Sequence, residues 1–451
     1  MKLLECTNRW KKVRLGAIFQ EVKEKNTNFT RKNAFKFTYG IIVDKKEYEL
    51  SQDLIDIYSK YTMVDPNDII INGLNLNYDF VTQRVAIVKR TGIITSSYIS
   101  LRERSSEIDP QYYCYYFKAM DSCKMFHGMG EGIRLTLSYD ELKGIPIAKP
   151  SYTEQSQIAH FLDWKISEIN KLISIKKKQV SFYKELRKAL IDEGILYGFK
   201  KSKSKGSGVY WLGNIPESWE ILPLKRVCKV NASISDIVKT MDDSDLVTFI
   251  PMSSVSATGD ADYSLKGRVA DFRKNFSSFA KGDVVVAKIT PCFENGKGAC
   301  LDKLDTAIGF GTTEFINLRP TSRILSRYLY MITMTRPFRE LGEKVMTGSA
   351  GQKRVPVNYI KNFTLGIPGI EEQKEILEKI DRKLEQVDEL ISAEIQSIKE
   401  LQKLKTTLIS DVVTGKIDVR NVEIPEYERV EKDFTEDDSS VMSEEIEKQE
   451  D

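Results

Sequence analysis

The chain has 451 residues, 41% of them hydrophobic and 29% charged, which indicates more than one folded domain and excludes a disordered or collagen-like chain. Its net charge is +3, but the charge is unevenly distributed: residues 419–451 carry a net charge of −9 and the remaining residues carry +12. This basic surplus is compatible with a nucleic-acid partner. No apolar run is long enough for a membrane helix and no signal peptide is recognisable, so we expect a cytoplasmic protein.

Residues 1–150 are expected to form a first globular domain. Short aliphatic runs at 69–71, 85–88 and 93–94 predict strands, because residues typical of turns bound them. The globular domains are therefore expected to have mixed α and β structure.

An internal repeat is the main organising feature of the sequence. The segment that begins at Leu142 recurs at Ile360, 218 residues later. The corresponding residues include Pro150 and Pro368, Gln155 and Gln373, and Asp163 and Asp381. The chain therefore contains two copies of one plan, a globular domain followed by a long helix.

Residues 151–198 and 369–417 are predicted to be these helices. Their hydrophobic residues recur in steps of three and four and keep the same heptad register in both copies, which is typical of a coiled coil. One polar residue interrupts each row, Lys176 in the first and Glu394 in the second. The expected seam consists of Leu162, Ile166, Ile169, Ile173, Lys176, Val180, Tyr183 and Leu190, with Ile380, Leu384, Val387, Ile391, Glu394, Ile398, Leu401 and Leu408.

The remaining segments complete the plan. Residues 199–218 are rich in Lys, Ser and Gly near their start and are expected to be a flexible linker. Residues 219–368 should form the second globular domain, with strands at 284–286 and 315–318. Residues 418–451 are acidic, sparse in apolar side chains and expected to be disordered.

Motifs for catalysis are missing from the sequence. It has no nucleotide-binding P-loop, no GxGxxG after a strand and no Asn/Asp-Pro-Pro-aromatic motif of amino-methyltransferases. The six cysteines show no CxxC spacing, and the two histidines are far apart, so no metal site is expected. A duplicated scaffold without such motifs indicates recognition rather than catalysis.

Several segments resemble the DNA specificity subunits of type I restriction-modification systems. The run SGVYWLGNIPESW, from Ser207 to Trp219, is similar to the opening of a target-recognition domain in that family. IPGIEEQKEI, which contains Pro368, resembles the start of its conserved helices, and LISDVVTGKI from Leu408 resembles their end. The resemblance covers about residues 1–418.

This resemblance implies an α/β fold (mixed α+β) with two pseudo-repeated globular target-recognition domains, separated by a central antiparallel coiled coil of two long helices. It implies a subunit without catalytic activity, in which each domain reads one half of a bipartite DNA target. Its expected partners are double-stranded DNA, two methyltransferase (modification) subunits and restriction (translocase-nuclease) subunits, in a prokaryotic cytoplasm. S-adenosylmethionine and ATP are expected on the partner subunits, and no cofactor on this chain.

Candidate DNA contacts are Asn, Gln, Lys, Arg, Ser and Thr side chains in loops beside glycine, because such groups bind base edges and phosphates. In the first domain they are Asn72, Asn75, Asn77, Gln83, Arg84 and Arg134. In the second they are Lys288, Thr290, Asn295, Lys297, Thr312, Thr313, Ser349, Gln352, Lys353 and Arg354. Each could instead belong to a solvated loop or a structural turn.

Two other functions remain open from the residues alone. The chain could be a fused restriction-methylation enzyme with an active site of its own, or a structural coiled-coil protein without a role on DNA. The missing catalytic motifs argue against the first, and DNA binding would exclude the second.

Overall fold

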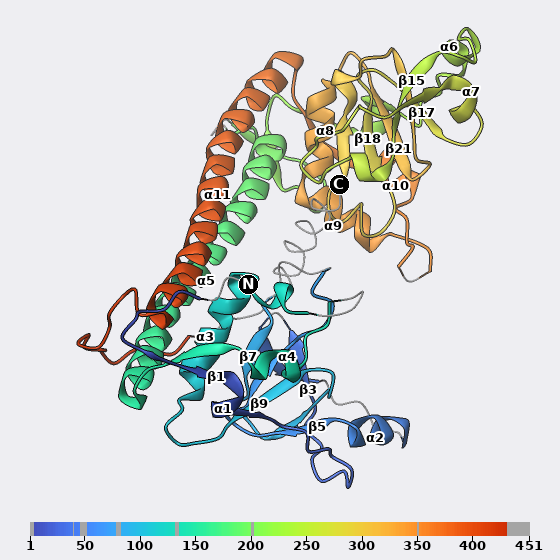
Figure 1. Cartoon of the computed structure of the whole chain (residues 1–451). Helices are drawn as coiled ribbons and strands as arrows, with labels where there is room; N and C mark the ends of the chain where they lie inside the picture. Colours follow the sequence, from blue (N-terminus) through green and yellow to red (C-terminus); the bar gives the residue numbers. More distant parts are fainter. Residues whose placement is uncertain are drawn as a thin grey trace. The chain divides into compact units, whose positions relative to one another are not determined.

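The computed structural model describes residues 4–38, 40–45, 52–77, 83–130, 135–199, 203–349 and 351–430. The chain divides into two compact units (Figure 1). Unit 1 combines residues 1–177 with 395–451, and unit 2 consists of residues 178–394. Each unit therefore contains one globular head together with part of each long helix.

The head of unit 1 is built on a four-stranded antiparallel sheet with the strand order β2-β9-β6-β7, and α3 packs against β7. Further antiparallel pairs are β1-β10, β3-β4 and β5-β8. The strands are β1 (Lys11–Arg14), β2 (Phe19–Glu21), β3 (Phe35–Thr38), β4 (Ile41–Asp44), β5 (Thr62–Val64), β6 (Ile69–Ile71), β7 (Val85–Ile87), β8 (Gly92–Ile94), β9 (Ile99–Glu103) and β10 (Pro146–Lys149). The helices are α1 (Leu15–Ile18), α2 (Gln52–Ser59), α3 (Pro110–Ser122) and α4 (Tyr139–Lys143).

Local sequence explains several of these elements. The helix α3 begins where Asp109 accepts a hydrogen bond from the Tyr112 main-chain N–H, directly before Pro110, which suits the first helical position. All three residues of β6 are fully buried, as expected of a central strand. The three strands predicted in this domain correspond to β6, β7 and β8, so those predictions are confirmed.

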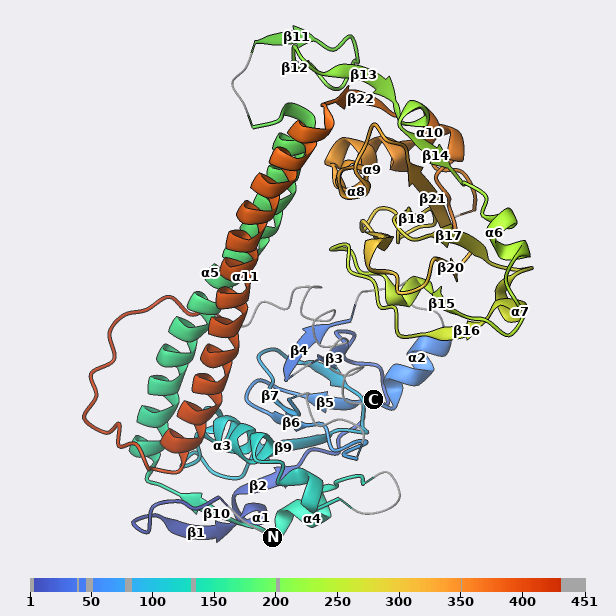
Figure 2. The ribbon, with the colours of Figure 1, turned by 90° about the horizontal axis from the view of Figure 1, so that it is seen from above.

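Unit 2 contains two four-stranded sheets, with the orders β14-β21-β18-β19 and β16-β15-β20-β17. The helix α8 packs on β18, β19 and β21 (Figure 2). The strands are β11 (Ser204–Gly206), β12 (Asn214–Pro216), β13 (Glu220–Pro223), β14 (Cys228–Val230), β15 (Leu246–Ile250), β16 (Lys266–Arg268), β17 (Ser277–Ala280), β18 (Val284–Ala287), β19 (Gly298–Cys300), β20 (Ile308–Gly311), β21 (Phe315–Pro320) and β22 (Thr364–Ile367). The short helices are α6 (Ser235–Lys239), α7 (Val269–Phe272), α8 (Ser326–Met334), α9 (Arg336–Lys344) and α10 (Val357–Asn362). The strands predicted at 284–286 and 315–318 are β18 and β21, which confirms them.

Two long helices, α5 (Tyr152–Tyr197) and α11 (Ile370–Val413), run side by side within each unit (Figure 2). In unit 1 the N-terminal part of α5 lies beside the C-terminal part of α11, where Lys405 Nζ donates to Asn170 Oδ1 at 2.9 Å. In unit 2 the opposite ends meet, and Arg187 Nε donates to Asp388 Oδ1 at 3.1 Å. The helices are therefore antiparallel, and the predicted fold class, mixed α and β structure with two long paired helices, is confirmed.

Every residue of the expected seam is buried or half-buried. In unit 1 these residues are Leu162, Ile166, Ile169, Ile173, Lys176, Ile398, Leu401 and Leu408. In unit 2 they are Val180, Tyr183, Leu190, Ile380, Leu384, Val387, Ile391 and Glu394. Burial falls towards the middle of each helix, since Leu162 and Ile380 are fully buried whereas Ile173 and Ile398 are half-buried.

The two heads attach to the helices through equivalent hydrogen bonds. In unit 1 the buried Gln155 side chain accepts from Asp109 N at 2.9 Å and donates to Pro150 O at 2.9 Å. In unit 2 the buried Gln373 accepts from Leu325 N at 2.9 Å and donates to Pro368 O at 2.9 Å. The same side chain of each repeat therefore joins the head to the start of its helix.

A second equivalent contact joins each head to the end of the other repeat's helix. Tyr112 Oη donates to Val413 O of α11 at 3.2 Å, and Tyr328 Oη donates to Ile195 O of α5 at 3.1 Å. Each head consequently packs against both helices within its own unit.

Each head also contains a buried carboxylate at the start of its central strand. Asp68, before β6, is bound by Arg102 (Nε–Oδ1 2.7 Å), and Asp283, before β18, is bound by Arg319 (Nε–Oδ1 2.8 Å). These pairs identify β6 and β18 as equivalent strands.

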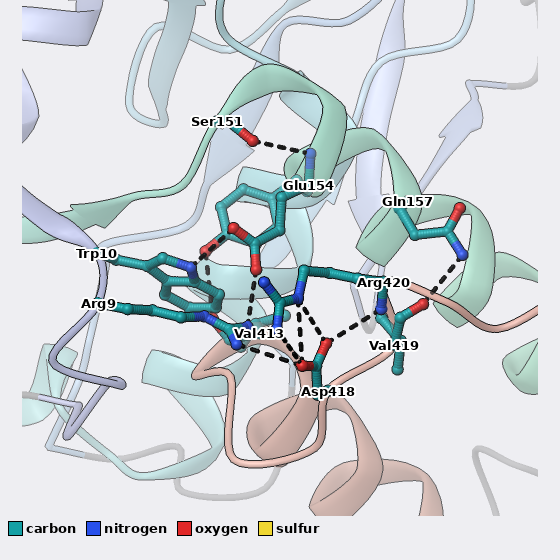
Figure 3. A network of polar contacts seen from close by, with 10 residues as sticks. Arg9, Trp10, Ser151, Glu154, Gln157, Val413, Asp418, Val419 and Arg420 are labelled. Carbon is teal, nitrogen blue, oxygen red and sulfur yellow. Dashed lines mark hydrogen bonds and ion pairs between the residues drawn. The ribbon is translucent and has the colours of Figure 1, made fainter.

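Two segments expected to lack structure are partly ordered. In the linker, residues 204–216 contain the antiparallel pair β11-β12, and Leu212 and Ile215 are buried. After α11, residues 414–430 run along α5, where Gln157 Nε2 donates to Val419 O at 3.0 Å (Figure 3). Val419 is buried in the core of unit 1. Its hydrophobic contacts order this segment, although the polar composition of the segment favours disorder. Residues 431–451 lie outside the described ranges.

Candidate nucleic-acid interface

Three loops of unit 2 that are distant in the sequence meet at one end of β18. Residues 288–297 follow β18, residues 312–314 precede β21, and residues 347–354 follow α9. Lys288 N donates to Glu314 O at 2.9 Å, and Thr290 N donates to Lys353 O at 2.9 Å. The residues predicted to contact DNA in the second head are thereby brought together.

Six of the predicted side chains in these loops are exposed, as direct contact with DNA requires: Asn295, Thr313, Ser349, Gln352, Lys353 and Arg354. Lys288 and Thr290 are half-buried, and Thr290 Oγ1 donates to Glu294 Oε1 at 2.9 Å. Two residues have structural hydrogen bonds, because Thr312 Oγ1 accepts from Glu314 N and Lys297 Nζ donates to Met252 O.

Arg354 is exposed but is held by a carboxylate. Its Nε donates to Glu314 Oε2 at 2.9 Å and its Nη2 donates to Glu314 Oε1 at 2.8 Å. The hydrogen bonds from Arg354 lower the pKa of Glu314, and the same bonds raise the pKa of the guanidinium. To bind DNA through Nε and Nη2, Arg354 would have to exchange Glu314 for a base or phosphate.

An open hollow of about 700 Å³ adjoins these loops. It is lined by Thr290, Glu294, Glu340, Glu343, Lys344, Met346, Gly351 and Lys353. Three carboxylates face two ammonium groups there, so the hollow is not a favourable place for phosphate.

The first head carries a corresponding loop, residues 72–77, after β6. Asn72 Oδ1 accepts from Leu74 N at 3.2 Å, so this side chain shapes the turn. Asn75 is exposed with a positive φ of 51°, a conformation that asparagine tolerates. Asn77 is half-buried and Gln83 is exposed, while Arg134 lies outside the described residues.

Arg84 differs from its predicted role. Its side chain is only 1% exposed, and Nη1 donates to Leu74 O at 2.8 Å and to Asn72 O at 3.2 Å. A guanidinium that binds carbonyl groups beneath the surface is not available to DNA. The contact of this loop with DNA stays a prediction, and Arg84 binds the main chain of the loop from its buried side.

Comparison with known proteins shows which proteins this chain is similar to. Residues 216–400 match the model of the type I restriction modification DNA specificity domain. Over 211 residues the chain is 36% identical to the type I restriction enzyme EcoAI specificity subunit of Escherichia coli, covering 46% of this chain and 34% of that protein. It is 24% identical over 434 residues to the type I restriction enzyme MjaVIII specificity subunit of Methanocaldococcus jannaschii, covering 93% and 95% of the two chains. Residues 216–400 are thus similar to this DNA specificity domain, and nearly the whole chain is similar to one type I specificity subunit at 24% identity.

The fold is also similar to that of a solved structure. A chain in one solved structure superposes on this chain with a TM-score of 0.66 at 12% identity. That structure is described as the basis of complex assembly and conformational transition of a type I restriction-modification system. The alignment covers 91% of this chain and 99% of that chain. At this identity the likeness concerns the fold alone. The chain spans about one third of the length of the EcoAI relative.

The described part of the chain has no cluster of three or more His, Cys, Asp or Glu side chains arranged to hold a metal ion. None of its described helices has the length and hydropathy needed to cross a bilayer.

Sequence reasoning missed two residues of the second-head loops. Glu314 directly follows the predicted residues Thr312 and Thr313, so its place in the sequence could have identified it as part of the site. Arg339 of α9 binds the 288–297 loop but lies far from it in the sequence, so no sequence signal could have identified this contact.

Proposed function

We propose that this chain is the DNA-recognition subunit of a type I restriction-modification complex and has no catalytic activity of its own. Each head reads one block of a bipartite target in double-stranded DNA. The two long helices dock methyltransferase subunits, which hold S-adenosylmethionine, and ATP-driven restriction subunits complete the assembly in a prokaryotic cytoplasm.

The observation that carries this proposal is the pair of equivalent loops. In each head a polar loop follows the central strand, β6 or β18, and exposes an asparagine, Asn75 or Asn295. Asparagine is suited to bidentate contact with adenine in the major groove. The exposed Lys353 supplies a charge for phosphate, and the 36% identity to a named specificity subunit supports the same function.

The test is selection from a pool of random DNA duplexes by the full chain, alone and with its modification subunit. Two short specified blocks around an unspecified gap are the expected result. Selection of no sequence would favour a purely structural coiled-coil protein.

The same preparation distinguishes the remaining alternative. The chain alone, incubated with duplex DNA, labelled S-adenosylmethionine and magnesium, should neither methylate nor cleave. Methylation or cleavage by the isolated chain would show that it is a single-chain restriction-methylation enzyme.

A further inference from the structure

Each head places a buried arginine beneath its strand-end loop. We call residues 72–77 loop A and residues 288–297 loop B; they follow the equivalent strands β6 and β18. Both loops expose an asparagine and bury their main chain on the side that faces the head. Buried carbonyl groups need donors, and water is excluded there, so the identity of the donor decides how firmly each loop is held.

In loop A the donor is Arg84. Besides its bonds to Leu74 O and Asn72 O, its Nη2 donates to Asn75 O at 3.4 Å. Its main-chain N–H donates to Asp121 Oδ2 at 2.7 Å, which fixes the backbone from which the side chain extends. One guanidinium therefore spans the carbonyls on both sides of the loop's bend, including that of the exposed Asn75.

In loop B the donor is Arg339 of α9. Its Nη1 donates to Phe293 O at 2.8 Å and its Nη2 donates to Gly296 O at 3.4 Å, so the bonded carbonyls flank Asn295. The guanidinium also lies 4.8 Å from the centroid of the Phe293 ring. Burial lowers the pKa of Arg339 to about 10, so the group stays charged at neutral pH.

The surroundings of Phe293 show how closely loop B is fitted to α9. A Cβ atom on Gly342 would lie 2.5 Å from the Phe293 ring, so glycine is required for this approach. Phe293 is fully buried, whereas Asn295, two residues later, is exposed. The loop is anchored through its main chain and one aromatic ring, and its polar tip projects away from them.

The two arginines are not equivalent in the repeat. Arg84 lies directly before β7, the neighbour of β6, whereas Arg339 lies in α9, which follows α8. Two different elements thus bring the same rigid, multidentate donor to the same kind of loop. A guanidinium fork holds several carbonyls in one geometry, which a flexible ammonium does not.

We infer that Arg84 and Arg339 are positioning residues for specificity, each fixing the main-chain shape of the loop that presents an asparagine to DNA. The inference rests on the proposed function. It assigns one buried arginine to each DNA block, although neither arginine touches DNA.

The test uses the full chain with its modification subunit and the random duplex pool. Arg339→Met should weaken base discrimination by roughly tenfold at one or more positions of a single block and leave the other block unchanged. Arg84→Met should do the converse, so each variant controls for the other. Arg339→Lys and Arg84→Lys should lie between wild type and the methionine variants. Affinity for random duplexes should stay within about twofold, because no phosphate contact is removed.

Arg336→Met separates positioning from general destabilisation. Arg336 begins α9 and binds Asp192 of α5 through Nε at 2.6 Å, so its loss weakens the same head without touching loop B. Wild-type discrimination is expected for this variant. The inference is overturned if Arg336→Met changes the same block, or if the Met and Lys variants at position 339 retain wild-type discrimination.

If a methionine variant does not fold, amide hydrogen exchange on the wild-type chain provides a second test. The selected duplex should slow amide exchange at residues 292–297, and unchanged exchange there would overturn the inference. If the wild type selects no sequence at all, the proposed function fails instead, so the two failures are distinguishable.

Discussion

Glu314 and Arg354 illustrate how the charge of one residue can control another at this surface. Arg354 is exposed, yet its Nε and Nη2 donate to the Glu314 carboxylate and its Nη1 donates to Gln352 O. A surface ion pair of this kind contributes little to stability, so its main effect is on the availability of the guanidinium.

Glu314→Gln should release Arg354 and remove a charge that repels phosphate. We expect several-fold tighter binding to random duplexes and a log Kd against log salt plot that is steeper by about one unit. The measurement is a salt titration of binding by fluorescence anisotropy. Glu220→Gln, which breaks the exposed pair with Arg323 elsewhere in unit 2, is the matched control. An equal change in both variants would contradict this role for Glu314.

Substitution of the exposed asparagines tests the two heads separately. Asn295→Ala should cost about 1–3 kcal/mol of discrimination at one position of one block, and Asn75→Ala should do the same in the other block. Sequencing of duplexes selected by each variant gives the result. A change in both blocks from either substitution would refute separate reading by the heads.

Residue type alone predicted the loops but not the role of each side chain. Arg84 and Arg354 are the same residue type beside loops of similar composition, but one is buried under the loop and the other is exposed and ion-paired. Burial and pairing depend on distant residues, Asp121 for one and Glu314 for the other. No local pattern contains that information.

At the scale of elements, the two long helices were predictable from their periodic hydrophobic spacing, and the central strands from short aliphatic runs bounded by turn residues. The ordered linker and the segment along α5 were not, since both have polar compositions and depend on tertiary contacts. Leu212, Ile215 and Val419 are buried, and their burial requires surfaces built by other parts of the chain.

Gln373 should be a major support for the junction between head and helix in unit 2. Gln373→Ala would leave Leu325 N and Pro368 O without this partner in a buried place, at a cost of about 1–3 kcal/mol. Thermal unfolding and amide exchange should locate the loss in unit 2. Gln396→Ala, which removes only an exposed contact with Glu400, should change stability by less than about 0.5 kcal/mol. Equal losses in the two variants would contradict this assignment.

At the scale of the whole molecule, we expect the long helices to set the gap between the two DNA blocks. Each is a single uninterrupted helix shared by both units, at 1.5 Å per residue roughly 65–70 Å long. Two heads that read major grooves from one side of a duplex favour block centres one turn apart, about 10–10.5 base pairs. The intervening bases should then be unspecified.

Insertion of four residues after Lys178, about one helical turn, should lengthen the tolerated gap or abolish binding without changing either block. The same insertion between Lys201 and Ser202, ahead of the β11-β12 pair, is the control and should have much less effect. Sequencing of host methylation sites reports the gap for both. An active helix variant with an unchanged gap would show that another element sets the distance.

The division of unit 1 between the two ends of the chain has a consequence for its synthesis. Gly415 has a φ of 73° and lies so close to Trp10 that a Cβ atom on Gly415 would be 2.8 Å from the indole ring. Trp10 also shares a hydrophobic core with Ile409, Val412 and Val413 near the end of α11. Unit 2 is contiguous, so a ribosome has delivered all of it before these residues emerge. The first head is therefore translated first, but its core stays incomplete until the end of α11 has been made. The second head can finish folding before that, so the heads finish folding in the reverse of the order in which they are translated.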